Sequence, residues 1–351
     1  MLRLLALTAH LVSNRLVTIP AMGKLTFSVG IPTFNQADFL EETILSLLNQ
    51  TRPPDEIVIS DHYSTDNTPD IIAKYAGKVR AVKPPPEVNL AGQYNFTLLS
   101  QNCDWISLLS SDDVARPNFC EVLARGASRS DDAVLVRAAW ENIDKTGAVL
   151  SQSYMMSVPH IERPPSNIFS QKNGPKVCFA AFAIRRKAFV ESGPIPVVFE
   201  SLADWALDVQ LAPFGSYVYE NEIISGYRVG HDGNKFRIRL GMWLRDMQRM
   251  YYEVMPLAAE RAGMTDRSWI AEASRAHFLR YLAEASDEFS PAERGEVAPH
   301  FESWALRTGD IVLLKDFVEG KRISTRVSLM ERGKRIIRPA AQKLYNLRRR
   351  P

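Results

Sequence analysis

Short polar and acidic side chains follow three β-rich apolar runs in the first third of the chain: Thr33 and Asn35 after the first, Asp61 after the second, and Asp112 with Asp113 after the third. Adjacent carboxylates suit a hard divalent cation, because Mg²⁺ or Mn²⁺ takes one or two protein carboxylates and fills the rest of its shell with water and phosphate oxygens. A metal-bound diphosphate is the ligand that this chemistry favours, since the metal would stabilise charge on a departing phosphate. The competing interpretation is that the acids only cap the helices that follow.

These side chains can act together only if the runs before them lie in one sheet. The sequence predicts strands over 25–32, 56–60, 79–82 and 105–109, with helices near 38–48, 69–75 and 91–99 and a further helix opened by Pro117. Strands that are apolar almost throughout and alternate with helices are typical of a parallel sheet covered on both faces. In such sheets ligands bind outside the carboxyl ends of the strands, which is where the polar residues stand.

The composition and the missing motifs exclude several classes of protein. Apolar residues make up 46% and charged residues 24% of the 351 residues, which is ordinary for a globular chain and excludes a collagen-like, coiled-coil or disordered protein. The sequence contains no glycine-rich fingerprint of dinucleotide-binding or P-loop proteins and no G-x-S-x-G elbow of hydrolases. The three cysteines, Cys103, Cys120 and Cys178, lack paired or ligand-like spacing, which favours a reducing compartment.

Several segments resemble family 2 glycosyltransferases of the GT-A fold. The first three read FSVGIPTFNQADFLEETILSLLNQT, EIVISDHYSTDNT and LLSSDDVARPNF. A later stretch, FAIRRKAFVESGPIPVVFESLADWALDVQLAPFG, which is followed by GYRVGHDGN, resembles the acceptor half of the same domain. The resemblance covers residues 24–234 and implies an α/β fold of the GT-A type, with a Rossmann-like, mixed but mainly parallel sheet flanked by helices.

The resemblance also implies roles for individual residues. The implied nucleotide-sugar contacts are Pro32, Thr33, Asn35, Asp61, Asn95 and Asp112. The implied ligands of a Mn²⁺ or Mg²⁺ ion are Asp113, which is the favoured one, and Asp112. On the acceptor side, Asp204 resembles the catalytic base, Trp205 an aromatic residue that borders the sugar, and His231 a family histidine. The chain departs from the family pattern at Ser110 and Ala203, where acids are common, and by an extra residue before His231.

Asp204 has a clear chemical purpose in an inverting transfer. Such a transfer is a single displacement at the anomeric carbon, in which the attacking hydroxyl loses a proton that a positioned carboxylate can take. The competing interpretation makes Asp204 the N-cap of a helix over 205–211, because Asp is a favoured cap.

The chain divides into four expected parts. Residues 1–21 are an N-terminal extension that may be dispensable, and residues 22–235 are the catalytic domain. Apolar residues at helical spacing predict helices over 240–262 and 268–284 and another that begins after Ser290, in a helical C-terminal region of residues 236–318. Residues 319–351 are a basic amphipathic tail with eleven Lys or Arg and two Glu.

The tail concentrates the positive charge of the chain. It carries +9, so the other 318 residues carry −6 within a total of +3. This asymmetry argues against a nucleic-acid binder and for one local contact with an anionic surface. Basic residues between apolar ones at helical spacing are typical of an interfacial helix, so we expect a cytoplasmic protein that lies on the inner face of the cell membrane through residues 319–351; a solvated tail is the alternative.

These observations predict an inverting, metal-dependent glycosyltransferase. It would move a sugar from a nucleotide-diphosphate sugar to a hydroxyl of a glycan or lipid-linked acceptor in bacterial surface polysaccharide synthesis. A sugar-1-phosphate nucleotidyltransferase is one alternative, but it needs a glycine-rich basic loop where this chain reads IPTFNQ. A non-catalytic relative that binds a nucleotide sugar or a glycan is the other alternative, which Ser110 and Ala203 leave open.

Overall fold

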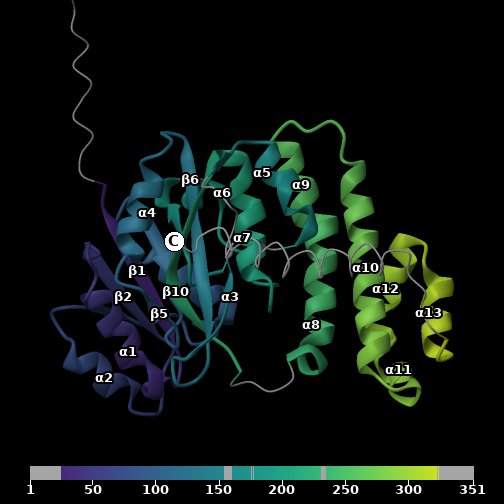
Figure 1. Ribbon diagram of the computed structural model, residues 1–351, viewed down its shortest axis with the longest axis horizontal. Helices are drawn as coiled ribbons and strands as arrows, with labels where there is room; N and C mark the ends of the chain where they lie inside the picture. Colours follow the sequence, from purple (N-terminus) through teal and green to yellow (C-terminus); the bar gives the residue numbers. More distant parts are fainter. Residues whose placement is uncertain are drawn as a thin grey trace, which may run out of the picture.

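The computed structural model of the chain describes residues 25–153, 160–174, 176, 178–230, 235–321 and 323. They form two parts that lie side by side, a sheet region (residues 25–230) and a helical region (residues 235–323) (Figure 1). The expected extension of residues 1–21 lies outside the described residues, as does the tail beyond residue 323.

The described strands form one mixed sheet. They are β1 (Phe27–Thr33), β2 (Glu56–Asp61), β3 (Arg80–Val82), β4 (Trp105–Leu108), β5 (Val114–Ala115), β6 (Ala133–Ile143), β7 (Val149–Ser153), β8 (His160–Glu162), β9 (Phe182–Arg185) and β10 (Ser216–Arg228). The order is β3-β2-β1-β4-β9-β6-β10-β5, with β7 paired to β6 and β8 to β10. The first four pair in parallel, as the sequence predicts, and β6 and β10 are also parallel, whereas β9 joins the two halves through antiparallel pairing on both sides. The expected mixed, mainly parallel α/β sheet is therefore confirmed.

Helices cover both faces of this sheet. In the sheet region they are α1 (Ala37–Leu48), α2 (Thr68–Lys74), α3 (Leu90–Leu99), α4 (Phe119–Ala127), α5 (Ser166–Phe169), α6 (Arg186–Ser192) and α7 (Ala203–Leu211). The strands bury side chains on both sides, because Trp105 and Leu109 join the core under α1 and α4 while Ile106 and Leu108 join the core under α3 and α7. Alternation of this kind explains why the strands are apolar almost throughout.

The helical region extends the second of these cores. Its helices are α8 (Lys235–Arg249), α9 (Met255–Arg261), α10 (Ser268–Glu288), α11 (Pro291–Val297), α12 (Pro299–Thr308) and α13 (Ile311–Val318). One continuous buried cluster runs from Phe182 of the sheet through Trp205 and Tyr251 to Trp304 and Phe317. The helical region therefore packs on the sheet region rather than forming a core of its own.

The single helix predicted over 240–262 is interrupted. A π-helical turn at Met250–Val254 separates α8 from α9, and Pro256 is the second residue of α9. Proline cannot donate to the carbonyl one turn earlier and its ring clashes there, so the wider turn accommodates it. The capping box predicted at Ser290 is present, with both hydrogen bonds to Glu293 formed.

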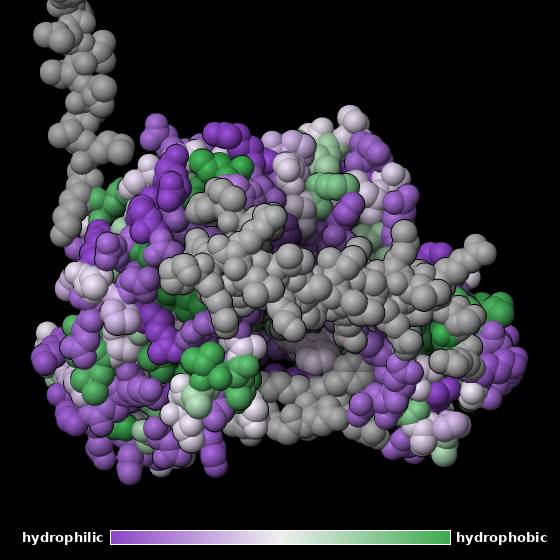
Figure 2. Space-filling view, in the orientation of Figure 1, coloured by the Kyte–Doolittle hydropathy of each residue, from purple (hydrophilic) through white to green (hydrophobic). Residues whose placement is uncertain are grey.

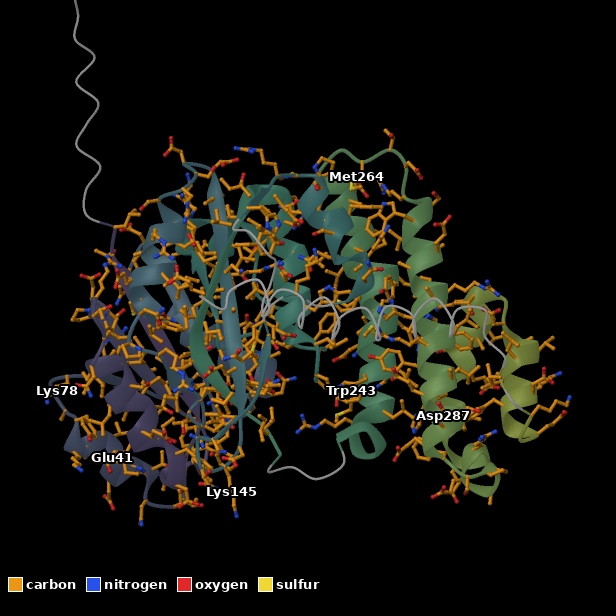
Figure 3. The ribbon with its side chains drawn as sticks, viewed as in Figure 1. Glu41, Lys78, Lys145, Trp243, Met264 and Asp287 are labelled. Carbon is orange, nitrogen blue, oxygen red and sulfur yellow. The ribbon has the colours of Figure 1, made fainter. Side chains whose placement is uncertain are left out.

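The other views show the extent of the helical region and its surface. Met264 lies in the loop before α10 and Asp287 near the end of this helix, which runs alongside α8 (Figure 3). Hydrophobic residues on the face in Figure 2 form small separate groups rather than one stripe. In the described part of the chain, no helix is long and apolar enough to cross a membrane.

Candidate active site

The ends of β1 and β2 form one side of the site. Thr33 and Asp61 are neighbours in the sheet register, and both are buried. The backbone oxygen of Thr33 accepts hydrogen bonds from the His62 N–H at 2.9 Å and from Gln93 Nε2 at 3.1 Å. The Thr33 hydroxyl is buried and has no hydrogen-bond partner among the described residues. A buried hydroxyl without a partner is costly, so this atom is suited to a bound ligand.

Asn35 joins the two loops that follow these strands. Its Oδ1 accepts the Thr65 N–H at 2.8 Å, and its own N–H donates to Ser64 Oγ at 2.9 Å. Its φ of 50° is in the left-handed region, which Asn tolerates better than most residues. The side chain of Asn35, although exposed, therefore fixes the shape of the loop. Pro32 is buried within β1.

Exposed aromatic side chains stand beside this edge and were missed in the sequence. Phe34 is 53% and Tyr63 44% exposed, and the His62 ring lies 6.1 Å from the first and 6.0 Å from the second. Lys83 Nζ lies 5.3 Å from the centre of the Tyr63 ring. Exposed aromatic rings next to buried polar groups can stack on a flat base. Large apolar residues directly after a strand end were the available signal.

Asp113 and Asp112 follow β4 and are held by Arg228 at the end of β10. The Arg228 N–H donates to Asp113 Oδ1 at 2.8 Å, and its Nε donates to the backbone oxygen of Asp112 at 2.7 Å. Arg228 is buried, and its other donors reach Glu42 Oε2 and the backbone oxygens of residues 144 and 145. Asp113 is also buried, whereas Asp112 is partly exposed. Arg228 was missed as a functional residue, although it stands in the motif GYRVGHDGN.

Asp204 is the second residue of α7, far along the chain from Asp112 and Asp113. Burial raises the pKa of its carboxyl group to about 6, and hydrogen bonds from the backbone, including the Trp205 N–H at 2.7 Å, lower it in part. Leu202 is the N-cap of α7, so Asp204 is not the cap that the competing interpretation required. A carboxyl group with a pKa of about 6 is mostly ionised at neutral pH, and its carboxylate is a stronger base than that of an ordinary Asp.

Three buried or half-buried groups connect the two acidic sites. Tyr94 of α3, Tyr227 of β10 and Cys178 have pKa values raised by burial and raised further by the charges of both Asp204 and Asp113. The acids after β4 and the acid on α7 therefore lie within electrostatic reach of the same three side chains. The described residues hold no cluster of three or more His, Cys, Asp or Glu that could bind a metal alone.

Two of the predicted site residues have structural contacts instead, and a third lies outside the described part of the chain. Trp205 is wholly buried against Tyr251 in the core, with ring centres 5.8 Å apart, so it cannot border a sugar. The amide of Asn95 is buried and bonded on both sides to the backbone of Ile195, at 2.8 Å each, which makes it a structural residue. His231 lies outside the described residues.

Gln93, which the sequence did not single out, lies at the ends of β1 and β2, where Asn95 was expected to contact the nucleotide sugar. It stands one half-turn earlier on α3 and is buried. Its Nε2 donates to the backbone oxygens of Thr33 and Ser60, both at 3.1 Å. It thus ties α3 to the carboxyl ends of β1 and β2, and polar residues within an otherwise apolar helix were the signal for it.

Comparison with known proteins relates part of the sheet region to a family. A sequence model described as Glycosyl transferase family 2 matches residues 28–193, which are just under half of the chain. The match includes most of β1, all of β2 and β4, and both acids after β4. It ends before Asp204, so it does not by itself assign a role to that residue.

Similar proteins include a bacterial hyaluronan synthase and a bacterial N-acetylglucosaminyltransferase. A hyaluronan synthase of Pasteurella multocida is 24% identical over 267 residues, which are 74% of this chain and 26% of that protein. The poly(ribitol-phosphate) beta-N-acetylglucosaminyltransferase TarP of Staphylococcus aureus is 33% identical over 114 residues, or 31% of this chain and 35% of that protein. The chain thus aligns with only about a quarter to a third of the length of these relatives.

A solved structure shows the same fold. The crystal structure of residues 1–349 of S. aureus TarS matches with a TM-score of 0.54 and 14% identity, covering 85% of this chain and 92% of that one. The same protein in complex with UDP-GlcNAc matches with a TM-score of 0.52. The likeness extends beyond the family match, because its coverage of the chain includes part of the helical region.

Proposed function

We propose that this chain is an inverting glycosyltransferase that transfers a sugar from a UDP-linked donor to a hydroxyl group of a glycan or lipid-linked acceptor in bacterial surface polysaccharide synthesis. The observation that carries the proposal is the convergence of two kinds of acid. The carboxyl edge of the sheet supplies Asp61, Asp112 and Asp113. The separate helix α7 supplies Asp204, whose charge acts on the same side chains, Cys178 and Tyr227, as the charge of Asp113. A donor held at the sheet edge would then present its sugar to a base on the opposite side.

The donor would lie across the ends of β1, β2 and β4. The exposed faces of Phe34 and Tyr63 suit a nucleobase, and the buried oxygens of Thr33 and Asp61 suit the polar edges of a base or a ribose. The UDP-GlcNAc complex of TarS and the name of TarP support a UDP-linked N-acetylhexosamine as the first donor to test.

A divalent cation fits the acids after β4. Asp112 is partly exposed and Asp113 uses one oxygen for the Arg228 N–H, so the pair offers the one or two carboxylates that Mn²⁺ or Mg²⁺ takes when phosphate oxygens complete its shell. The burial of Asp113 favours Asp112 as the main ligand, the reverse of the order expected from the sequence. When bound, the cation would neutralise charge on the leaving diphosphate.

Asp204 would act as the general base. Its carboxylate accepts the proton of the acceptor hydroxyl as the new bond from that oxygen to the anomeric carbon forms. The bond between the anomeric carbon and the donor phosphate breaks, and its electron pair leaves with the nucleoside diphosphate. Attack opposite to the leaving group inverts the anomeric centre, which requires the base and the diphosphate on opposite sides of the sugar.

A thermal-shift panel of nucleotide sugars, with and without Mn²⁺, tests the donor side of the proposal. Binding to the folded state raises the melting temperature by mass action, so a UDP-sugar should stand out over its GDP and ADP counterparts. The bound donor is then assayed for release of UDP with and without glycan acceptors. Binding without any hydrolysis or transfer would indicate a non-catalytic relative, and release of pyrophosphate from UTP and a sugar phosphate would indicate a nucleotidyltransferase.

A further inference from the structure

The segment that leads into α7 takes its hydrogen bonds from the helical region. Residues 193–202 connect α6 to α7, and residues 198–202 are the last part of this connection. The N-cap residue of α7 makes no side-chain capping hydrogen bond. Backbone N–H groups at the start of a helix have no partners within it and must find them elsewhere. Here the partner is a carboxylate on α8, 44 to 46 residues further along the chain.

Asp246 of α8 accepts, with a single oxygen, the N–H of the N-cap residue of α7 and the N–H groups of the two residues before it. Its Oδ2 lies 3.0 Å from the nitrogen of Glu200, 2.7 Å from that of Ser201 and 3.1 Å from that of Leu202. Asp246 is fully buried. Hydrogen bonds to an ionised acceptor are stronger than neutral ones, and a negative charge at the start of a helix is favoured by the helix dipole.

Two arginines on the same helix hold the rest of the segment. Arg249 donates from Nη1 to the Val198 backbone oxygen at 2.6 Å and lies 3.4 Å from Asp246 Oδ1. Arg245 donates from Nη2 to Glu200 Oε1 at 2.9 Å. Positions 245, 246 and 249 lie on one side of α8 because they are separated by one, three and four residues. This side of α8 thus fixes both the backbone and a side chain of the segment.

We propose that Asp246 is a positioning residue for the general base Asp204, and the inference rests on the proposed function. The last residue that Asp246 holds, Leu202, is the N-cap of α7, and Asp204 follows two residues later. A shift of the segment would therefore move the carboxylate of Asp204 relative to the sheet edge. A misplacement of about 1 Å at a catalytic group can lower turnover by about a hundredfold.

If the only role of position 246 were to stabilise the fold, a packed apolar side chain would serve better than Asp246. Burial raises the pKa of Asp246, which shows that its charge is costly to bury, although the backbone N–H groups of the segment and the charge of Arg249 offset part of that cost. Replacing buried charges by packed apolar side chains is often neutral or stabilising. A buried carboxylate that collects three N–H groups instead gives the segment one defined geometry, which is what a base needs.

The test compares two buried carboxylates of the helical region. Asp310 is the matched control, because it is 6% exposed and accepts Arg275 but lies at the start of α13, away from α7. Asp246→Ala should lower kcat at saturating donor by about 10- to 100-fold and leave the donor dissociation constant within about twofold. Asp310→Ala should also lower the melting temperature, but its kcat should remain near that of wild type. Equal losses of kcat in both variants, or a matching loss of donor affinity in Asp246→Ala, would overturn the inference.

A double variant separates positioning from stability. If Asp246 acts through Asp204, then Asp204→Asn with Asp246→Ala should be no slower than Asp204→Asn alone, since the two residues form one unit. Multiplying losses would contradict the inference. Should Asp246→Ala not fold, Asp246→Asn carries the test, because it keeps the shape and one acceptor oxygen and should still lower kcat without weakening donor binding. An inactive Asp204→Asn beside a fully active Asp246 variant would reject the positioning role alone, whereas an active Asp204→Asn would reject the proposed base.

Discussion

The backbone N–H of Arg228 donates to the Oδ1 atom of Asp113 at 2.8 Å, across 115 residues of sequence. This bond joins the end of β10 to the acidic pair after β4. The guanidinium group of Arg228 also donates to Glu42 and to the backbone oxygens of residues 112, 144 and 145. The backbone and the buried side chain of Arg228 together therefore hold four segments around the site.

Arg228→Lys should therefore weaken both folding and donor binding. Lysine keeps the charge but cannot make the forked set of bonds, and each buried acceptor left without a partner costs about 1–3 kcal/mol. We expect a loss of at least about 2 kcal/mol in the free energy of unfolding, measured with urea, and weaker UDP binding. Arg80→Lys is the control, because Arg80 pairs with Glu56 at the surface and should change stability little. Wild-type stability and binding in Arg228→Lys would contradict this role.

The acids after β4 should differ in their contribution to metal-dependent binding. Asp112→Asn should strongly weaken UDP-sugar binding in Mn²⁺ and hardly change it in EDTA, because the partly exposed carboxylate would be the main ligand. Asp113→Ala should also lower the melting temperature, since the Oδ1 atom that it removes accepts a buried backbone N–H. Calorimetric titration with and without Mn²⁺ checks both. Equal affinity of the wild-type protein in EDTA and in Mn²⁺ would remove the metal from the mechanism.

The sequence predicted the strands and the polar residues at their carboxyl ends better than the contacts between distant segments. The strand ends were predictable because Thr33, Asp61 and Asp112 directly follow apolar runs, and parallel strands bring such positions to one edge. Arg228 and Asp246 were not predictable as partners, because their contacts lie 115 and about 45 residues away in the sequence.

The two incorrect assignments have a common cause. A motif gives the position of a residue but not the direction in which its side chain points. Trp205 follows Asp204 on α7, and successive residues on a helix point about 100° apart, so Trp205 can pack in the core while Asp204 points in another direction. Asn95 points toward Ile195 for the same reason, while Gln93 on α3 reaches the strand ends.

The basic tail remains a prediction that can be tested by truncation. Ending the chain after Ile323 keeps the ion pairs of Lys321 with Asp316 and Glu319 and removes most of the positive charge of the tail. Binding to vesicles that contain anionic lipid should fall and should be sensitive to salt in the full chain. Unchanged vesicle binding after truncation, or binding that does not respond to salt, would assign the tail another task.

The pKa of Asp204 predicts the pH dependence of transfer. The base must be ionised, so kcat should be half-maximal near pH 6, fall about tenfold per pH unit below that value and reach a plateau above pH 7. Turnover at saturating donor and acceptor, measured between pH 5 and 8 in buffers of constant ionic strength, checks the prediction. A flat profile over this range, with the protein folded throughout, would argue against Asp204 as the base.

Asp204→Asn should separate catalysis from stability. The amide has the size of the carboxylate but cannot accept the proton, so turnover should fall by about two to four orders of magnitude while UDP-sugar affinity stays near that of wild type.

The melting temperature of Asp204→Asn should not fall with its turnover. Burial raises the pKa of Asp204 above its value in the unfolded chain, so the folded state favours the neutral form, and this group lowers stability as the pH rises from about 4 to 6. Asp204→Asn removes that cost. Its melting temperature should therefore equal or exceed that of wild type at pH 7.5, and the difference should disappear below about pH 4. Normal turnover would defeat the assignment of the base, whereas a lower melting temperature at neutral pH would show that the carboxylate is needed for the start of α7 instead.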